Sequence, residues 1–137
     1  RNALTRIPDG AMVMIHDGVR PFISKELIGK MLSMMGEDCR ALIPVLPVTD
    51  TLRSTDPSIP APDRSRTVSV QTPQIFFSED IREAYRRPYE LGFTDDASVA
   101  ERAGIRINMT EGEKFNIKIT TPDDLVIGEA ILLRQEP

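Results

Sequence analysis

The sequence predicts a layered α/β fold with a largely parallel β-sheet. Segments with the character of strands and of helices alternate along the 137 residues, which is the pattern of α/β proteins. Two strand segments, 11–15 and 41–46, are apolar runs without a charge, as is typical of strands buried on both faces. Hydrophobic residues make up 40% and charged residues 28% of the chain, which is enough apolar material for one core. We therefore expect one domain over 1–137.

The first part of the chain is predicted to form a strand, a helix and a second strand. The run 11–15 ends in a polar turn, and Ser24 is a suitable cap for the helix that follows. Apolar residues continue at helical spacing to Met35, and Gly36 is a plausible stop. In the second strand, 41–46, Pro44 indicates an edge or a bulge.

Residues 47–66 differ in composition from the rest of the chain. They contain several prolines and few large apolar side chains, between short strand-like pieces at 49–53 and 66–70. Loops of this length are usually functional or disordered. Composition alone leaves two interpretations open, an arm that leaves the globular body and a disordered surface loop.

Helices and strands alternate again in the second part. The expected helices begin after Ser or Thr with acids in the first turn, and the first two end at glycine. The expected strands show apolar residues at every second position. We expect helices over 79–91, 96–103 and 122–133 and strands over 105–109 and 116–119.

The net charge of −4 gives the chain no general attraction to nucleic acid or to anionic membranes, so a bound phosphate must be held by a few placed cations. The single cysteine, Cys39, excludes an internal disulfide and indicates a reducing compartment such as the cytoplasm. The most apolar stretch, 41–48, is far shorter than the roughly 20 residues of a membrane helix. The chain starts at Arg1 without a methionine, and we expect it to be a segment of a longer protein.

Charged and polar residues stand where the predicted strands end and helices begin. Asp17 and Arg20 follow the first strand, Thr94 precedes a helix, and Lys118 lies between two isoleucines. Ligands of α/β sheets bind beyond the carboxyl ends of the strands, so these residues are candidates for a site. The alternatives are an ion pair that closes a turn for Asp17 and Arg20, and coverage of an edge strand for Lys118. We interpret His16, the only histidine, as structural.

Several common catalytic patterns are absent from the sequence. It has no spacing of Cys and His that would bind a metal, no credible Ser-His-Asp set, no GxGxxG motif and no P-loop. A nucleotide-binding enzyme would need its Gly-rich loop elsewhere, and we expect that loop in a preceding part of the protein.

Six motifs occur in a fixed order along nearly the whole chain. They are His16-Asp17-Gly18-Val19-Arg20-Pro21, Pro47-Val48-Thr49-Asp50-Thr51, Asp63-Arg64, Thr72-Pro73-Gln74, Thr94-Asp95-Asp96-Ala97-Ser98 and Asn116-Ile117-Lys118-Ile119-Thr120. Their order and spacing resemble those of the 2-C-methyl-D-erythritol 4-phosphate cytidylyltransferase family. The resemblance implies part of a Rossmann-like nucleotidyltransferase fold, a three-layer α/β/α domain with a mostly parallel sheet and a protruding β-arm over 47–66. The family's Gly-rich CTP-binding loop is not in this chain.

The resemblance also implies an enzymatic activity for the full-length parent. The family transfers CMP from CTP to 2-C-methyl-D-erythritol 4-phosphate, which gives CDP-methylerythritol and pyrophosphate in non-mevalonate isoprenoid biosynthesis. It implies Mg²⁺ with CTP, a homodimer formed through the arm, and a location in the cytoplasm or, in a plant, the plastid stroma. Neither nucleic acid nor a membrane is an expected partner. We expect the isolated chain to be inactive.

The resemblance assigns roles to seven residues. Lys118 and Asp17 are the expected catalytic residues, with Asp17 as the one candidate metal ligand. Five others are expected to bind substrate, and Arg64 is expected to do so across the dimer: Arg20, Thr51, Arg64, Thr72 and Thr94.

Two other functions remain as alternatives. Ribitol-5-phosphate cytidylyltransferase shares several of the motifs, although the run 94–99 favours the isoprenoid enzyme. The second alternative is a fragment that dimerises through its arm without catalysis. The parent could also be one half of a fused two-enzyme protein.

Overall fold

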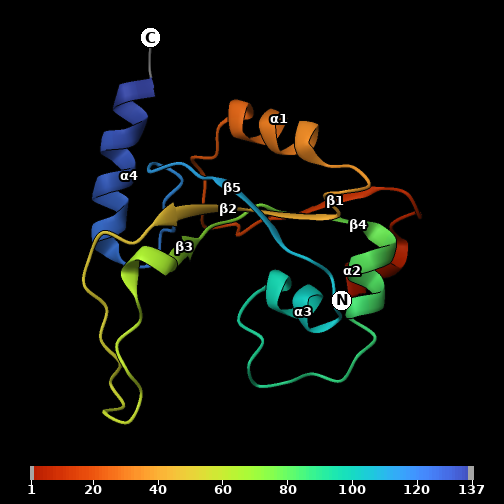
Figure 1. Ribbon diagram of the computed structural model, residues 1–137. Coiled ribbons are helices and arrows are strands. Elements are labelled where there is room, and N and C mark those ends of the chain that lie inside the picture. The colour runs from red at the N-terminus through yellow and green to blue at the C-terminus, as the bar shows by residue number, and fades with distance from the viewer. Residues whose placement is uncertain (1, 136–137) are drawn as a thin grey trace.

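The computed structural model describes residues 2–135 and contains both strands and helices along the chain (Figure 1). The α-helices are α1 (Lys25–Met34), α2 (Ser78–Ala84), α3 (Asp96–Arg102) and α4 (Pro122–Gln135). The strands are β1 (Met12–Ile15), β2 (Ala41–Pro47), β3 (Val68–Val70), β4 (Gln74–Phe77) and β5 (Asn108–Glu111). Two 3₁₀ turns complete the list, η1 (Asn2–Arg6) and η2 (Arg64–Arg66).

The five strands form one mixed sheet, so the expectation of a mostly parallel sheet is wrong for this chain. β4 lies between β1 and β2 and is antiparallel to both, and β3 is antiparallel to β2. Only β2 and β5 pair in parallel. β1, β2 and β5 therefore share one direction, as α/β crossovers require, and the antiparallel β3–β4 segment is inserted among them. The sequence pattern does not encode the direction of a strand, and the β4 segment was not expected to be a strand at all.

A bulge separates β3 from β4 along the same edge of β2. Val45 is paired with Val70 and Leu42 with Ile75, so the span 70–75 faces the shorter span 42–45. Residues 71–74 thus face only residues 43–44 of β2, and bulges of this kind redirect side chains away from the ladder.

Side chains alternate between the two faces of the sheet and meet a helical layer on each. Leu42 and Ile75 point to one face and pack with Leu27 and Met31 of α1. Their neighbours point to the other face, where η1, α2 and α3 complete the larger core, whose members include Ala41, Ile43, Phe76, Ile81, Ala84, Val99 and Ala100. Figure 1 shows α1 on one side of the sheet and α2 and α3 on the other. The predicted three-layer arrangement is confirmed.

The helices begin largely where their caps predict. Ser24 caps α1 by accepting a hydrogen bond from the backbone N–H of Leu27 at 2.9 Å. Asp95 and Ser98 form a reciprocal capping box at the start of α3. α2 differs from the prediction, because it begins with Ser78 as its first residue and ends at Ala84 instead of near Gly92. Pro88 lies within the predicted span and disfavours a continuous helix there.

Two predicted strands are not formed, and one is shifted. Residues 49–53 and 116–119 have no strand pairing, and the strand expected at 105–109 occupies Asn108–Glu111. In 116–119 the backbone instead bonds to a turn, to Val19 and to the Arg20 side chain, and the carbonyl oxygen of Thr49 accepts from Arg64, so the sequence pattern was not sufficient for a strand.

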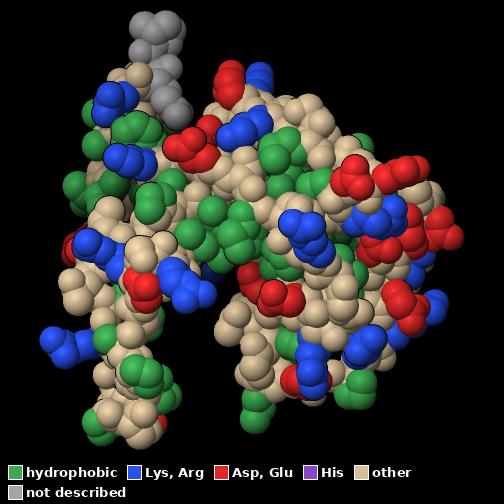
Figure 2. Space-filling model, in the orientation of Figure 1, with side chains coloured by type: hydrophobic (Ala, Val, Ile, Leu, Met, Phe, Trp, Pro, Cys, Tyr) green, Lys and Arg blue, Asp and Glu red, His purple; other side chains and the backbone are tan. Residues whose placement is uncertain are grey.

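The segment between β2 and β3 projects from the body as an arm. Figures 1 and 2 show it extending away from the sheet at the lower left. Its base is the short β2–β3 ladder, and Asp56 and Asp63 accept hydrogen bonds from nearby serines within it. Most of its side chains are exposed.

α4 leaves much of its apolar surface uncovered. Ile131 is buried, and Gly128 brings the helix so close to Phe22 that an added Cβ would lie 3.1 Å from the ring. Figure 2 shows hydrophobic side chains at the surface over α4, on the left. Several apolar side chains of this helix are more than half exposed: Leu125, Val126, Ile127, Leu132 and Leu133. Within residues 2–135, no helix combines the length and the apolar character that crossing a membrane requires.

Glu79 generates a prediction about acid stability. Its carboxylate accepts hydrogen bonds from the backbone N–H of Gly10 and from Ser78 and pairs with Arg40, and these interactions lower the pKa of Glu79 to about 2. Because the folded-state pKa lies below the unfolded value, the stabilisation is complete above about pH 5 and is lost as the pH falls towards about 2. We expect Glu79→Gln to lower the denaturant midpoint at neutral pH and to make the acid decline shallower.

The control is Glu101→Gln, the same change at an exposed position of α3. Acid unfolding curves of equal steepness in the original protein and in the Glu79→Gln variant would contradict the role given to Glu79.

Candidate active site

The predicted candidates come together at one edge of the sheet. Asp17 follows the carboxyl end of β1, and Thr72 precedes β4, whose first residue is paired with Ile15, the last of β1. Lys118 follows the carboxyl end of β5. Parallel strands end at the same edge, and the antiparallel β4 starts there, so segments distant in sequence converge.

Asp17 is the centre of an ion-pair cluster. Its Oδ2 atom lies 3.1 Å from Nε of Arg20 and 3.2 Å from Nζ of Lys118. Burial opposes the negative charge, but hydrogen bonds and attraction from Lys118 and Arg20 outweigh it, so the pKa of Asp17 is lowered. The Arg20 side chain is 12% exposed and that of Lys118 is 47% exposed. The Asp17 carboxylate is therefore shared by a largely covered cation, Arg20, and a more accessible one, Lys118.

A chain of hydrogen bonds fixes the turn that carries Asp17. The Thr72 hydroxyl accepts from the backbone N–H of Asp17 at 2.9 Å and lies 3.0 Å from Nδ1 of His16. Nε2 of His16 lies 2.9 Å from the carbonyl oxygen of Arg20, which can only accept. Nε2 therefore donates to this oxygen, and the contact between Nδ1 and the Thr72 hydroxyl joins His16 to the same chain of hydrogen bonds. These contacts agree with the structural interpretation of His16.

Asn116 connects the Lys118 segment to the rest of the site. Its carbonyl oxygen accepts from Nη1 of Arg20 at 2.8 Å, and its side-chain Nδ2 donates to the carbonyl oxygen of Thr72 at 2.8 Å. Asn116 is fully buried. On the other side of Lys118, the N–H of Ile119 donates to the carbonyl oxygen of Val19 at 2.9 Å. Asn116 belonged to a recognised motif, but its burial and its bonds to Arg20 and Thr72 could not be predicted from that motif.

The three remaining predicted residues lie outside the cluster. Thr94 is exposed just before α3, and its N–H donates to Ser98. Thr51 is exposed on the arm. Arg64 donates from Nη1 to the carbonyl oxygen of Thr49 at 2.8 Å, at the base of the arm. The structure thus brings together Asp17, Arg20, Thr72 and Lys118, while the substrate contacts predicted for Thr51, Arg64 and Thr94 remain predictions.

The described residues do not form a metal site of their own. Within 2–135, no group of three or more His, Cys, Asp or Glu side chains is placed to hold a metal ion. The candidate ligand Asp17 shares its Oδ2 between two cations. Mg²⁺ usually binds through one or two carboxylates with substrate phosphates supplying other ligands, so any metal here would depend on the nucleotide.

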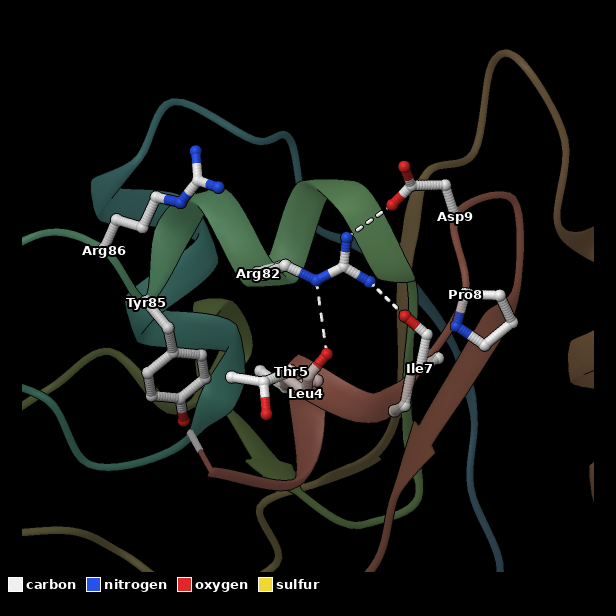
Figure 3. Close-up of a pocket in the computed structure, with 8 residues that line it drawn as sticks. All are labelled: Leu4, Thr5, Ile7, Pro8, Asp9, Arg82, Tyr85 and Arg86. Carbon is white, nitrogen blue, oxygen red and sulfur yellow. Dashed lines mark hydrogen bonds and ion pairs between the residues drawn. The ribbon is translucent and has the colours of Figure 1, made fainter.

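A separate cavity of about 540 Å³ lies between η1 and α2 (Figure 3). Its principal cation, Arg82, donates to the carbonyl oxygens of Leu4 and Ile7 and pairs with Asp9. In Figure 3 the guanidinium group points into these contacts between α2 and the N-terminal segment. The N–H groups of Arg82 are thus used to hold the N-terminal segment against α2. The Asp17 cluster is therefore the better candidate for a catalytic site.

The cluster has the properties of an anion site. Arg20 supplies a held guanidinium group, and the exposed Lys118 supplies a movable ammonium group. Such groups can neutralise charge on phosphate oxygens without a covalent intermediate. The fold and site define a Rossmann-like α/β domain with a cationic site at its sheet edge.

Comparison with known proteins identifies the family. The model of the family "2-C-methyl-D-erythritol 4-phosphate cytidylyltransferase" matches residues 1–134, and the chain belongs to this family. Relatives of that name from Porphyromonas gingivalis and Bacteroides thetaiotaomicron are 48% and 43% identical, over 96% of this chain and 60% of theirs. The chain thus spans about 60% of the length of these relatives.

Solved structures confirm the nucleotidyltransferase fold of the family. The cytidylyltransferase from Thermus thermophilus is 38% identical with a TM-score of 0.78, over 89% of this chain and 62% of that one. The 4-diphosphocytidyl-2C-methyl-D-erythritol synthase from Anaerococcus prevotii is 31% identical with a TM-score of 0.83, over 96% and 61%. The predicted fold class is confirmed, apart from the strand direction corrected above.

Thr72→Val tests the hydrogen-bond chain. The change keeps the shape of the side chain but removes the oxygen that serves Asp17 and His16. We expect a loss of about 1–2 kcal/mol in the free energy of unfolding, measured with denaturant, because the Asp17 N–H loses its acceptor. Thr55→Val on the exposed arm is the control. Equal effects of the two variants would contradict the bridging role of Thr72.

Proposed function

We propose that the full-length protein carrying this chain transfers CMP from CTP to 2-C-methyl-D-erythritol 4-phosphate. The observation that carries the proposal is the convergence of Arg20 and Lys118 on Asp17 at the sheet edge. The names of the relatives support the same reaction and favour methylerythritol phosphate over ribitol phosphate as the acceptor.

In the proposed reaction, a phosphate oxygen of the acceptor attacks the α-phosphorus of CTP. The new P–O bond forms as the bond from the α-phosphorus to the bridging oxygen breaks, and pyrophosphate leaves. Catalysis consists of positioning and charge neutralisation. Lys118 is exposed enough to turn its ammonium group from Asp17 towards the reacting phosphate, where it stabilises the developing negative charge.

Asp17 and Arg20 are proposed to bind the polyol. The Asp17 carboxylate can accept hydrogen bonds from hydroxyl groups, while its pairing with Arg20 fixes its orientation. Thr72 and Thr94 are proposed to line the same pocket. Gln74 supports this arrangement, because it donates from Nε2 to the Asp95 carboxylate at 2.8 Å and so ties the start of α3 to β4.

We propose that Mg²⁺ arrives with CTP and that Asp17 is its one candidate protein ligand. This follows from the chemistry of nucleotide phosphates, which supply ligands that the described residues lack. The roles given to Lys118 and Arg20 do not depend on the metal. The single cysteine and the phosphorylated substrates favour the cytoplasm as the location, or the plastid stroma in a plant.

We propose that the arm forms a homodimer and carries Arg64 and Thr51 to the site of the other subunit. Support comes from the projection of the arm, from its exposed side chains, and from the position of Arg64 outside the Asp17 cluster. A guanidinium group on such an arm is suited to bidentate binding of a substrate phosphate.

Lys118→Ala tests the proposed reaction in the full-length protein. We expect kcat to fall by about 10²–10³ with a smaller change in KM, because a charge-stabilising group is lost. The assay is pyrophosphate release with CTP, Mg²⁺ and methylerythritol phosphate. The control is Lys114→Ala, an exposed lysine for which the described residues show no ion pair.

A full-length protein without turnover would refute the proposed function, and a near-normal Lys118→Ala variant would reduce Lys118 to a structural cation. The 137-residue chain alone is expected to show no turnover, since it has no Gly-rich phosphate loop.

Mixed dimers test whether Arg64 acts across the interface. Full-length Arg64→Ala and Lys118→Ala homodimers should both be nearly inactive. If Arg64 acts in the other subunit, a mixed dimer has one site with both defects and one with neither, so coexpression should restore up to about half of the original rate per mixed dimer. If Arg64 acts within its own subunit, each site retains one defect. Confirmed mixed dimers without recovered activity would refute the crossed arm.

A further inference from the structure

Lys118 occupies a segment without regular secondary structure. Residues 116–120 belong to neither a helix nor a strand, so no hydrogen-bond ladder fixes the backbone there. The position of the lysine depends on individual contacts on either side of it. After Lys118, the N–H of Ile119 donates to the carbonyl oxygen of Val19. Before it, Asn116 makes hydrogen bonds with Arg20 and Thr72.

Gln71, in the bulge between β3 and β4, holds the segment that leads to Lys118. Its Nε2 donates to the carbonyl oxygens of Glu113 at 2.8 Å and of Asn116 at 3.2 Å. Its Oε1 accepts from the N–H of Glu113 at 3.0 Å. Gln71 is 5% exposed, and its own N–H donates to the carbonyl oxygen of Pro44 at 2.9 Å. The side chain therefore extends from the sheet and closes the turn at 113–116.

An amide suits this position because both donors and acceptors face it. A carboxylate at residue 71 would place negative charge against the carbonyl oxygens of Glu113 and Asn116. An apolar side chain would remove one donor from each of these oxygens and would take away the acceptor of the Glu113 N–H. Gly112 fits the same arrangement, since an added Cβ would lie 2.4 Å from Oε1 of Gln71. A side chain at residue 112 would therefore displace the Gln71 amide from its present position.

We propose that Gln71 is a positioning residue of the transfer reaction and acts by placing Lys118. Its amide donates to the carbonyl oxygen of Asn116, which also accepts a hydrogen bond from Arg20. These two bonds hold the backbone two residues before Lys118 in a defined position relative to the sheet. This inference rests on the proposed cytidylyl transfer for its kinetic consequence, while its structural consequence can be measured separately.

The kinetic test uses Gln71→Glu in the full-length protein. A lysine displaced by about 1 Å is expected to lower kcat by about 10²-fold while KM for the acceptor changes little. The double variant with Lys118→Ala should be no slower than Lys118→Ala alone, because Gln71 acts through the lysine. A loss in kcat that multiplies in the double variant would overturn the proposal, as would a normal kcat in Gln71→Glu.

Hydrogen exchange of the same full-length variants gives a readout that does not need activity. In Gln71→Glu the amides of residues 112–119 should exchange at least about tenfold faster, whereas the core strands remain protected. The control is Arg40→Gln, which removes ion pairs with Glu79 and Asp80 at the opposite end of β2 and should leave 112–119 protected. Unchanged exchange at 112–119 in Gln71→Glu would overturn the proposal that Gln71 holds this segment in place.

Gln71→Asn is the second variant if the carboxylate prevents folding. It keeps the amide but shortens the side chain, so the same kinetic split and the same local loss of protection are expected. If the full-length protein shows no cytidylyl transfer, the proposed function fails, and the exchange experiment still decides whether Gln71 holds residues 112–119 in place. If transfer depends on Lys118 but not on Gln71, only this inference fails.

Discussion

The antiparallel segment inserted between β1 and β2 is the constraint on which the candidate site depends. At its bulge, residues 71–73 lie outside the residue pairs of the ladder, while β4 remains in the middle of the sheet. Neighbouring side chains then reach three separate parts of the chain: Gln71 the turn after β5, Thr72 the turn after β1, and Gln74 the start of α3. Because of the bulge, side chains from this one segment hold three parts of the sheet edge in place through hydrogen bonds.

The charge of the site differs from the charge of the molecule. The chain carries a net charge of −4, yet Arg20 and Lys118 share the single carboxylate of Asp17. The cluster therefore has one positive charge more than it has negative charges, and the hydrogen bond from Arg20 to the carbonyl oxygen of the buried Asn116 holds the guanidinium group in place. A site of this kind selects anions by local geometry, because overall attraction to polyanions is absent.

The parts of the fold that could be predicted are those with a local signature. The apolar runs of β1 and β2 and the caps of α1 and α3 follow from short-range physics, whereas the direction of β4 depends on pairing between distant segments. Asp17 and Arg20 were found because charged residues follow a predicted strand, and Lys118 because it stands between two isoleucines just before a predicted helix. Gln71 was missed because a glutamine beside a turn reads as a surface residue, and only the fold shows that it is buried.

The arm contributes little to the stability of the fold. It leaves between β2 and β3, whose short ladder closes its base, and its exposed residues contribute little to either core. The entropy of closing such a loop grows only with the logarithm of its length, by about 0.6 kcal/mol for each doubling. Insertions and deletions at its tip therefore leave the folding free energy nearly unchanged, and the arm can vary in length and sequence without disturbing the sheet from which it emerges.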